Sequence, residues 1–303
     1  MRVAIFGATG FVGNYLVRAL LAAGHEPSVL VRPGSEKKLA QAERCRVTSG
    51  DIGSVDAIRK MLQGCDAVIY NIGLLKEFPR RGITFEEAHF TGVQRVIEAA
   101  QDIGVRRFLL MSANGVRQPG TPYQETKFRA EELLRATNLD WTIFQPSVIF
   151  GDSGGSQEFS HQLYNELVKP PVPAVAFPGV EMSPVFIDDV VDAFVNALAD
   201  PSTVSKTYAL GGPEVLSWKQ MVERVAAAVG RDKWFVTMPL GLMKIGATFF
   251  DWLPFFPATR DQLTMLEEGN TADSSIVESL TGRPAAAFDP ENLAYLKALS
   301  ARK

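Results

Sequence analysis

Residues 2–13 read RVAIFGATGFVG, and this stretch decides the fold. Its first five residues have the composition of a buried strand, and three glycines follow them at once. Gly7 permits a tight exit from the strand, Gly10 lets the backbone approach a pyrophosphate, and Gly13 lets the next helix pack close to the sheet. We expect that helix from Phe11 to Ala23, with its N-terminal amides facing phosphates. The stretch therefore predicts a nucleotide-binding turn.

Composition limits the class of protein. The chain has 303 residues, of which 46% are hydrophobic and 21% are charged, and this is ordinary globular usage that excludes disordered and fibrous classes. This length allows one large domain or a domain with a smaller lobe. A net charge of −3 gives no long-range attraction to phosphate backbones, so we expect no nucleic-acid partner.

Cysteine and histidine usage gives no sign of a metal centre. The two cysteines, Cys45 and Cys65, lie outside any CxxC or Cys/His cluster, and the chain has three histidines. We expect both thiols to be reduced and structural, with no metal bound. Since the first strand starts at the second residue, we expect no signal peptide and a cytoplasmic location, with the inner face of a membrane as a peripheral alternative.

Apolar runs alternate with helical patterns along the first half of the chain. Further strands are expected at 28–31, 44–48, 67–70, 108–112 and 141–144, and further helices at 36–42, 55–62, 84–103 and 123–136. This alternation predicts an α/β fold with a doubly wound parallel sheet of Rossmann type. We expect a dinucleotide-binding domain at 1–150 and a smaller mixed α/β lobe at 151–303, with about 183–210 returning to the first domain.

The end of the second strand bears on the choice of cofactor. NAD sites place a carboxylate there to accept hydrogen bonds from the ribose, but residues 29–35 contain none. Arg32 could instead bind a 2′-phosphate with support from Ser35 or Lys37, which would favour NADP(H) over NAD(H). The alternative is that Arg32 is a solvated residue at a strand end.

Two further strand ends supply candidates for the cofactor site. Asp51, with Ile52 after it, could meet the adenine edge, although an Asp here could equally cap the helix that starts near Val55. Asn71 and Gly73 close the fourth strand, where small residues would let the ribose lie against the backbone.

Candidate catalytic residues follow the fifth strand. Tyr123 and Lys127 are four apart on a predicted helix and therefore share one face. The ammonium would favour phenolate and lower the pKa of Tyr123, making the phenol a proton donor and acceptor for carbonyl and alcohol interconversion. Ser112, at the end of the fifth strand, would hold the substrate oxygen. The alternative is a partly buried tyrosine at a helix start, with Lys127 in solvent.

Several segments together carry a resemblance to a known family. They are Gly7–Gly13, Glu87–Val93, Tyr123–Lys127 with Ala130–Glu131, Gln145–Gly151, Ser183–Val190, Tyr208–Pro213, Arg260–Leu263 and Glu291–Leu296. The chain resembles an atypical short-chain dehydrogenase/reductase, and its GxxGxxG spacing is typical of extended or atypical relatives. Within that superfamily it is most similar to relatives of the nucleotide-binding accessory subunit of respiratory complex I, alpha subcomplex subunit nine. The similarity covers nearly the whole chain.

The strand-end residues above, together with this resemblance, give the set of candidate cofactor-binding residues, and the resemblance exposes one departure. The set is Gly7, Thr9, Gly10, Phe11, Val12, Gly13, Arg32, Ser35, Lys37, Asp51, Ile52, Asn71, Gly73, Lys127, Pro146 and Val148. Extended enzymes usually carry an asparagine three residues before Gly92, where it orders a proton-relay water; here His89 stands there. His89 could hydrogen-bond near the cofactor or be a helix histidine satisfied by a backbone carbonyl.

The segment 238–257 is apolar and aromatic but contains Lys244, Asp251 and the prolines Pro239 and Pro254. These interruptions argue against a membrane span. The segment could form an interfacial or partner-binding helix, or an amphipathic helix that closes the second lobe.

Two functions remain from sequence. The first is an NADP(H)-dependent oxidoreductase acting on a carbonyl or hydroxyl group, and the Tyr123–Lys127 pair favours it. The second is a non-catalytic NADPH-binding subunit or assembly factor of a membrane-associated complex, a type that the resemblance includes. The His89 departure and the aromatic segment favour the second.

Overall fold

A computed structural model describes residues 1–154, 158–242 and 260–300. Their contacts divide the chain into two compact units. The first unit comprises Met1–Gln145 and Val191–Ala209, and the second comprises Pro146–Val190 and Leu210–Lys303. The sequence placed the boundary after residue 150 and the returning segment at about 183–210.

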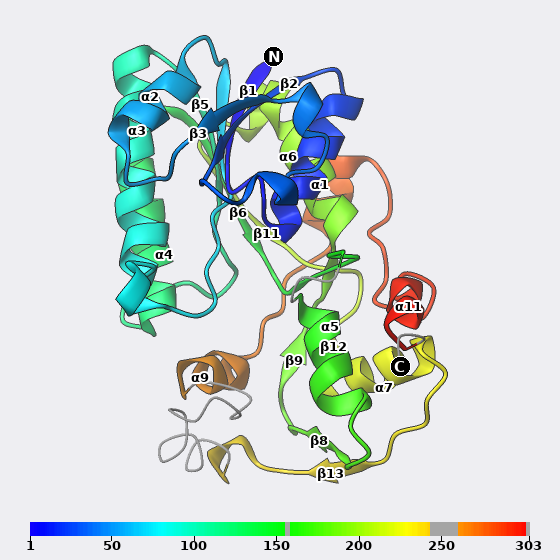
Figure 1. The fold of residues 1–303 in the computed structure, drawn as a ribbon. Coiled ribbons are helices and arrows are strands. Elements are labelled where there is room, and N and C mark those ends of the chain that lie inside the picture. The colour runs from blue at the N-terminus through cyan, green and yellow to red at the C-terminus, as the bar shows by residue number, and fades with distance from the viewer. Residues whose placement is uncertain (155–157, 243–259, 301–303) are drawn as a thin grey trace. The chain divides into compact units, whose positions relative to one another are not determined.

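The first unit is built on a seven-stranded sheet in the order β11-β6-β5-β4-β1-β2-β3 (Figure 1). The strands are β1 (Arg2–Phe6), β2 (Glu26–Val31), β3 (Arg46–Ser49), β4 (Ala67–Tyr70), β5 (Arg107–Met111), β6 (Asp140–Pro146) and β11 (Lys206–Leu210). Neighbouring strands from β3 to β6 pair in parallel. The predicted doubly wound Rossmann fold is confirmed, and its cofactor edge is the one where these strands end.

Helices cover both faces of this sheet, with α2, α3 and α4 on one face and α1 and α6 on the other (Figure 1). They are α1 (Phe11–Ala22), α2 (Val55–Leu62), α3 (Gly92–Ile103), α4 (Pro122–Arg135) and α6 (Ile187–Ala199), with a short 3-10 turn η6 (Pro201–Thr203). Apolar side chains such as Ile58, Val96 and Leu134 fill the space between α2, α3, α4 and the sheet. The bounds predicted for β1, β4 and α2 agree with the structure.

Two predicted helices need correction. Residues 36–42 form separate 3-10 turns, η1 (Glu36–Lys38) and η2 (Ala42–Arg44), instead of a helix. The reason lies in α1, because the Asn14 amide donates to the Lys38 carbonyl and its oxygen accepts the Ala40 N–H. The predicted helix 84–103 follows the 3-10 turn η3 (Pro79–Arg81) and starts as a π-helical segment, η4 (Glu86–Thr91), before α3.

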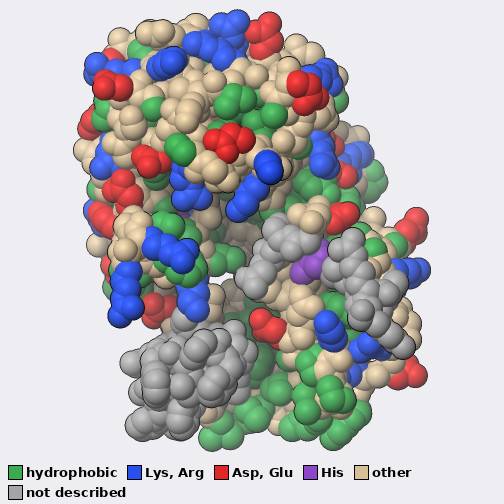
Figure 2. Space-filling view, viewed as in Figure 1, with side chains coloured by type: hydrophobic (Ala, Val, Ile, Leu, Met, Phe, Trp, Pro, Cys, Tyr) green, Lys and Arg blue, Asp and Glu red, His purple; other side chains and the backbone are tan. Residues whose placement is uncertain are grey.

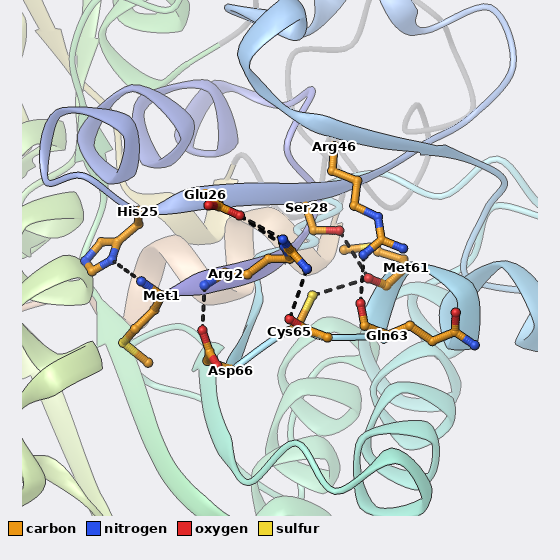
Figure 3. Close-up of polar contacts among 11 residues, drawn as sticks. Met1, Arg2, His25, Glu26, Ser28, Arg46, Met61, Gln63, Cys65 and Asp66 are labelled. Atoms are coloured by element: carbon orange, nitrogen blue, oxygen red, sulfur yellow. Dashed lines mark hydrogen bonds and ion pairs between the residues drawn. The ribbon is translucent and has the colours of Figure 1, made fainter.

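Polar contacts fix the opposite end of the strands, away from the cofactor edge (Figure 3). The Arg2 guanidinium pairs with Glu26 of β2, and the Arg2 amide donates to Asp66 before β4. Cys65 donates to the Met61 carbonyl at 3.3 Å, and burial raises the pKa of its thiol. Cys65 therefore serves packing, in keeping with the structural role expected from the sequence.

The second unit is a mixed α/β body with three short two-stranded sheets. Its strands are β7 (Ile149–Phe150), β8 (Ala174–Ala176), β9 (Glu181–Met182), β10 (Val185–Phe186), β12 (Leu216–Ser217) and β13 (Phe235–Thr237). Its helices are α5 (Phe159–Leu163), α7 (Trp218–Ala228), α9 (Arg260–Glu268), α10 (Ser275–Thr281) and α11 (Lys297–Ser300), with the π-helical segment η5 (Tyr164–Val168) and the 3-10 turn η7 (Ala294–Leu296). Phe150, Tyr164, Val225 and Phe288 lie in its own apolar core.

Most of the aromatic segment predicted at 238–257 lies outside the described residues, which stop at 242 and resume at 260. Among the helices that are described, none has both the length and the apolar character that crossing a membrane requires.

Candidate functional site

The glycine turn after β1 has the geometry expected of a phosphate cradle. Gly7 has φ +94°, and a Cβ on it would lie 2.8 Å from the Asn71 carbonyl oxygen. A Cβ on Gly13 would lie 2.1 Å from the Gly7 carbonyl oxygen, so glycine alone lets α1 approach the end of β1 this closely. Thr9, Phe11 and Val12 stand half-buried around the turn.

Gly10 differs from its two neighbours. Its φ of −83° suits any residue, and a Cβ there would meet only the Gly7 carbonyl oxygen, at 3.4 Å. No contact within the described chain therefore requires glycine at this position, whereas a phosphate lying against the backbone does. No side chain caps the N-terminus of α1, so its amides face outward. The turn fits a bound dinucleotide.

Arg32 follows β2 directly and is exposed. Its carbonyl accepts the Ser35 N–H, and Gly34 has φ +84°, so residues 32–35 form a tight turn. In the described parts of the chain, the Arg32 and Lys37 side chains have no hydrogen-bond or ion-pair partner. The nearby carboxylate of Glu36 accepts the Gly34 N–H at 3.1 Å. The predicted phosphate-binding role of Arg32, Ser35 and Lys37 stays a prediction.

The ends of β3 and β4 carry the other sequence candidates. Asp51 accepts the Gly53 N–H at 2.9 Å, while Ser54 caps α2 by accepting the Ala57 N–H. The alternative that Asp51 caps this helix is therefore wrong, because Ser54 stands one residue before its start. Ile52 is half-buried against the core beneath α2 and α3.

Beside the glycine turn, Asn71 is buried and donates its backbone N–H to the Phe6 carbonyl. Gly73 is exposed, and a Cβ on it would meet no atom within 4 Å. Both residues therefore stand at the edge where β1 and β4 end, as the sequence predicted, and their contact with ribose stays a prediction.

Ser112 and Lys127 line one small cavity, of about 10 Å³, between β4, β5, α3 and α4. The Lys127 ammonium donates to the Met111 carbonyl at 3.1 Å. The Ser112 hydroxyl is buried, and it alone among the buried side-chain polar atoms of the described residues has no hydrogen-bond partner. This volume corresponds to about one water molecule.

Tyr123 lies one helical turn before Lys127 on α4, and the Lys127 Nζ is 5.8 Å from the centre of the phenol ring. The predicted proximity of the pair is confirmed. The predicted lowering of the phenol pKa is wrong, because burial raises the pKa of Tyr123. Burial also lowers the pKa of Lys127 to about 8, against a smaller opposing effect of the Glu131 carboxylate.

His89 is fully engaged at the centre of this group. Its Nε2 accepts the Leu74 N–H at 3.1 Å, and its Nδ1 lies 3.2 Å from the Thr126 hydroxyl. Its ring stacks on Phe85 and meets Tyr123 edge-on, with ring centres 5.2 Å apart in the latter pair. The sequence left open a hydrogen bond near the cofactor or one to a backbone carbonyl. Within the described chain the partners are the Leu74 backbone amide and the Thr126 hydroxyl, and a contact with the cofactor stays a prediction.

The remaining two sequence candidates belong to the second unit. Pro146 ends β6, and Val148 is half-buried and its carbonyl accepts the Val185 N–H at 3.0 Å. Their predicted contact with a cofactor stays a prediction.

Comparison with known proteins identifies the family. A model described as NAD(P)H-binding matches residues 7–167, which include the glycine turn, Ser112, Tyr123 and Lys127. The chain belongs to the NAD(P)H-binding family. It is an NAD(P)-binding, oxidoreductase-like protein.

Curated relatives agree with the resemblance inferred from sequence. The ceramide reductase of Caulobacter vibrioides is 27% identical over 252 residues, which cover 82% of this chain and 78% of the relative. The alpha subcomplex subunit 9 of the mitochondrial NADH dehydrogenase of Mus musculus is 28% identical over 281 residues, covering 86% of this chain and 70% of the relative. This family member thus has relatives of both kinds, named reductases and an accessory subunit.

Among solved structures, the UDP-glucuronic acid 4-epimerase of Bacillus cereus in complex with UDP-glucuronic acid and NAD has a TM-score of 0.74 at 18% identity. The match covers 99% of this chain and 100% of that one. At this identity the likeness confirms the fold alone.

Three groups at the site were missed by sequence reasoning: the Thr126 hydroxyl, the Leu74 amide and the Met111 carbonyl. Thr126 is 37 residues from His89, and the other two act through the main chain. No sequence signal identifies such partners, because they depend on where α4 packs against the loop after β4.

Proposed function

We propose that this protein is an NADP(H)-dependent oxidoreductase that reduces a carbonyl group or oxidises the corresponding alcohol. The observation that carries the proposal is the buried Ser112 hydroxyl without a partner, in the same cavity as the Lys127 amine. A buried hydroxyl without a protein partner can hydrogen-bond a ligand in the cavity, and such groups are found at functional sites. Tyr123 stands one helical turn from Lys127, at the edge of the sheet where this family binds its nucleotide.

Each side chain has a role that its surroundings support. A phenol is protonated at neutral pH, so Tyr123 serves as a proton donor in the direction of reduction. Lys127 uses one of its three donors on the Met111 carbonyl and keeps two for the ribose and the phenol. Ser112 orients the substrate oxygen. The bound nicotinamide supplies or accepts the hydride.

The preference for NADP(H) rests on the turn after β2. Arg32 is exposed there beside Ser35 and Lys37, and the one carboxylate in the turn, Glu36, accepts a backbone amide. A guanidinium suits a 2′-phosphate because it donates two parallel hydrogen bonds.

Titration of the purified protein with NADPH and NADH tests the cofactor. Arg32→Ala should weaken NADPH binding roughly tenfold or more, since a hydrogen bond to a charged group is lost, and should leave NADH binding within about twofold. Lys60→Ala, which removes an exposed cation from α2, is the control and should change neither. Equal losses for both nucleotides would refute the NADP(H) assignment.

Turnover is tested by following NADPH oxidation with a panel of ketones, aldehydes and quinones. Tyr123→Phe should lower kcat by about 10²–10⁴ with NADPH affinity unchanged, since it removes a proton donor. If the parent and Tyr123→Phe both bind NADPH but neither turns over any compound, the oxidoreductase proposal is rejected in favour of the second function.

That second function is an accessory subunit that holds NADPH as a structural ligand. It is supported by the neutral, fully hydrogen-bonded His89 in place of the relay asparagine and by a Tyr123 pKa that burial raises. In this case NADPH should raise the melting temperature by the amount that its affinity dictates and should remain unoxidised.

A further inference from the structure

Residues 74–85 form a loop between β4 and η4 that exposes two large apolar side chains. Leu75 is 59% exposed and Phe78 is 45% exposed. Leu75 and Phe78 are three positions apart and together form an apolar projection on this surface loop. Exposed hydrophobic residues are normally scattered singly.

The projection has a defined shape. Phe78 donates its N–H to the Ile83 carbonyl at 2.7 Å, and Ile83 donates back to the Phe78 carbonyl at 3.3 Å. Between them Pro79–Arg81 form the 3-10 turn η3, which Gly82 ends with φ +68°. The closed turn holds Phe78 at a fixed place on the surface.

Cations surround these apolar side chains. Lys76, Arg80 and Arg81 are exposed on the same loop, while the carboxylate of Glu77 accepts the Phe85 N–H at 2.7 Å. Figure 2 shows Lys and Arg side chains next to hydrophobic ones at the left of the view, around the lower end of α4. The exposed surface of the loop is therefore apolar and positively charged.

One end of the loop contacts Tyr123, and the other end is linked to it through His89. Leu74 is hydrogen-bonded to His89, whose ring meets Tyr123, and the Phe85 ring lies 5.8 Å from the Tyr123 ring. The loop is therefore anchored at its ends to the candidate site.

We propose that this loop docks the protein on an anionic lipid bilayer. Leu75 and Phe78 enter the region between headgroups and acyl chains, and Lys76, Arg80 and Arg81 contact the negatively charged headgroups. A second copy of the chain fits less well, because a symmetric contact through this loop would bring the same cations together. Docking does not depend on turnover, so its test is separate from that of the proposed function.

Flotation with vesicles tests the apolar contribution. The full chain should float with phosphatidylcholine vesicles that contain about a third phosphatidylglycerol, and Leu75→Ser with Phe78→Ser should bind them about tenfold more weakly. Val47→Ser with Val55→Ser is the matched control, since these residues are 45% and 43% exposed elsewhere in the first unit, and it should bind like the parent. Equal binding by the loop variant would overturn the proposal.

The charges are tested on the same vesicles. Arg80→Gln with Arg81→Gln should weaken binding about tenfold, and salt should weaken the parent likewise. Arg18→Gln with Lys60→Gln removes the same net charge from α1 and α2 and should have little effect. Equal binding of the parent to pure phosphatidylcholine vesicles would contradict the requirement for anionic headgroups. Equal losses in both charge variants would mean that the overall charge of the protein, and not the loop, causes the binding.

Insertion is tested without weakening the loop. In Phe78→Trp, the added fluorescence should shift to the blue on vesicles and be quenched by brominated acyl chains, after subtraction of the parent spectrum. The proposal would be overturned if the added tryptophan stayed exposed to water while the protein floated. It would also be overturned if sedimentation showed that the loop mediates only self-association.

Discussion

The imidazole Nδ1 of His89 lies 3.2 Å from the Thr126 hydroxyl, and the tautomer of the ring follows from the partner of its other nitrogen. Since Nε2 accepts the Leu74 N–H, the proton must be on Nδ1, which donates to Thr126. Thr126 in turn donates to the Pro122 carbonyl at 2.8 Å. A neutral histidine thus joins the loop after β4 to the helix that carries Tyr123 and Lys127.

His89 makes stability depend on pH. Burial, with a smaller effect of the Lys127 charge, lowers its pKa from 6.5 to about 2, so the unfolded chain binds a proton at pH 5 that the folded protein does not. This contribution to stability is complete above pH 6.5 and is lost as pH falls. Between pH 7 and pH 5 His89 alone should reduce the free energy of unfolding by about 2 kcal/mol.

Urea unfolding of the parent and of His89→Gln at both pH values measures this effect. Glutamine can accept the Leu74 N–H and donate to Thr126, so the variant should fold and should lack about 2 kcal/mol of the pH dependence. His25 and His161 are present in both proteins and cancel in the difference. The same pH dependence in both would show that His89 is protonated in the fold.

Lys127 should make the stability of the fold depend on pH in the alkaline range. Its pKa falls from 10.5 to about 8 on burial, so above pH 8 the unfolded chain holds a proton that the folded protein has released, and stability rises with pH. From pH 7.5 to pH 9.5 we expect a gain of about 2 kcal/mol in the parent relative to Lys127→Met, which has no charge to lose. Chemical unfolding measures it, and parallel profiles for the two proteins would place Lys127 in solvent.

The glycine turn contains one glycine that the fold requires and another that only nucleotide binding requires. Gly13→Ala should lower the free energy of unfolding by about 1–3 kcal/mol, because the new methyl would lie 2.1 Å from the Gly7 carbonyl oxygen. Gly10→Ala should leave stability unchanged, since its methyl would meet only one atom at 3.4 Å, yet weaken nucleotide binding at least about tenfold. Thermal melting and NADPH titration check both, and unchanged NADPH affinity in Gly10→Ala would argue against phosphate contact.

Local patterns predicted the first unit well because its strands and helices follow from periodicity and turn residues. They failed at 36–42, where the Asn14 side chain holds the backbone of residues 38 and 40 from another helix. They also gave the wrong direction for the Tyr123 pKa, because spacing locates Lys127 but does not report burial. The short strand pairs of the second unit, such as β8 with β13, join residues about 60 apart and leave no local pattern.

Ser112 offers the sharpest test of the candidate site. Its buried hydroxyl has no partner in the described chain, so Ser112→Ala removes a desolvated polar group and should raise the free energy of unfolding by about 1 kcal/mol. Ser28 is the matched control, since its buried hydroxyl donates to the Met61 carbonyl and Ser28→Ala should destabilise by about 1 kcal/mol. If Ser112 orients the substrate, the stabilised variant should also lose turnover about 10²-fold. Destabilisation of Ser112→Ala to the same extent as Ser28→Ala would instead show that the hydroxyl is satisfied within the fold and serves its stability.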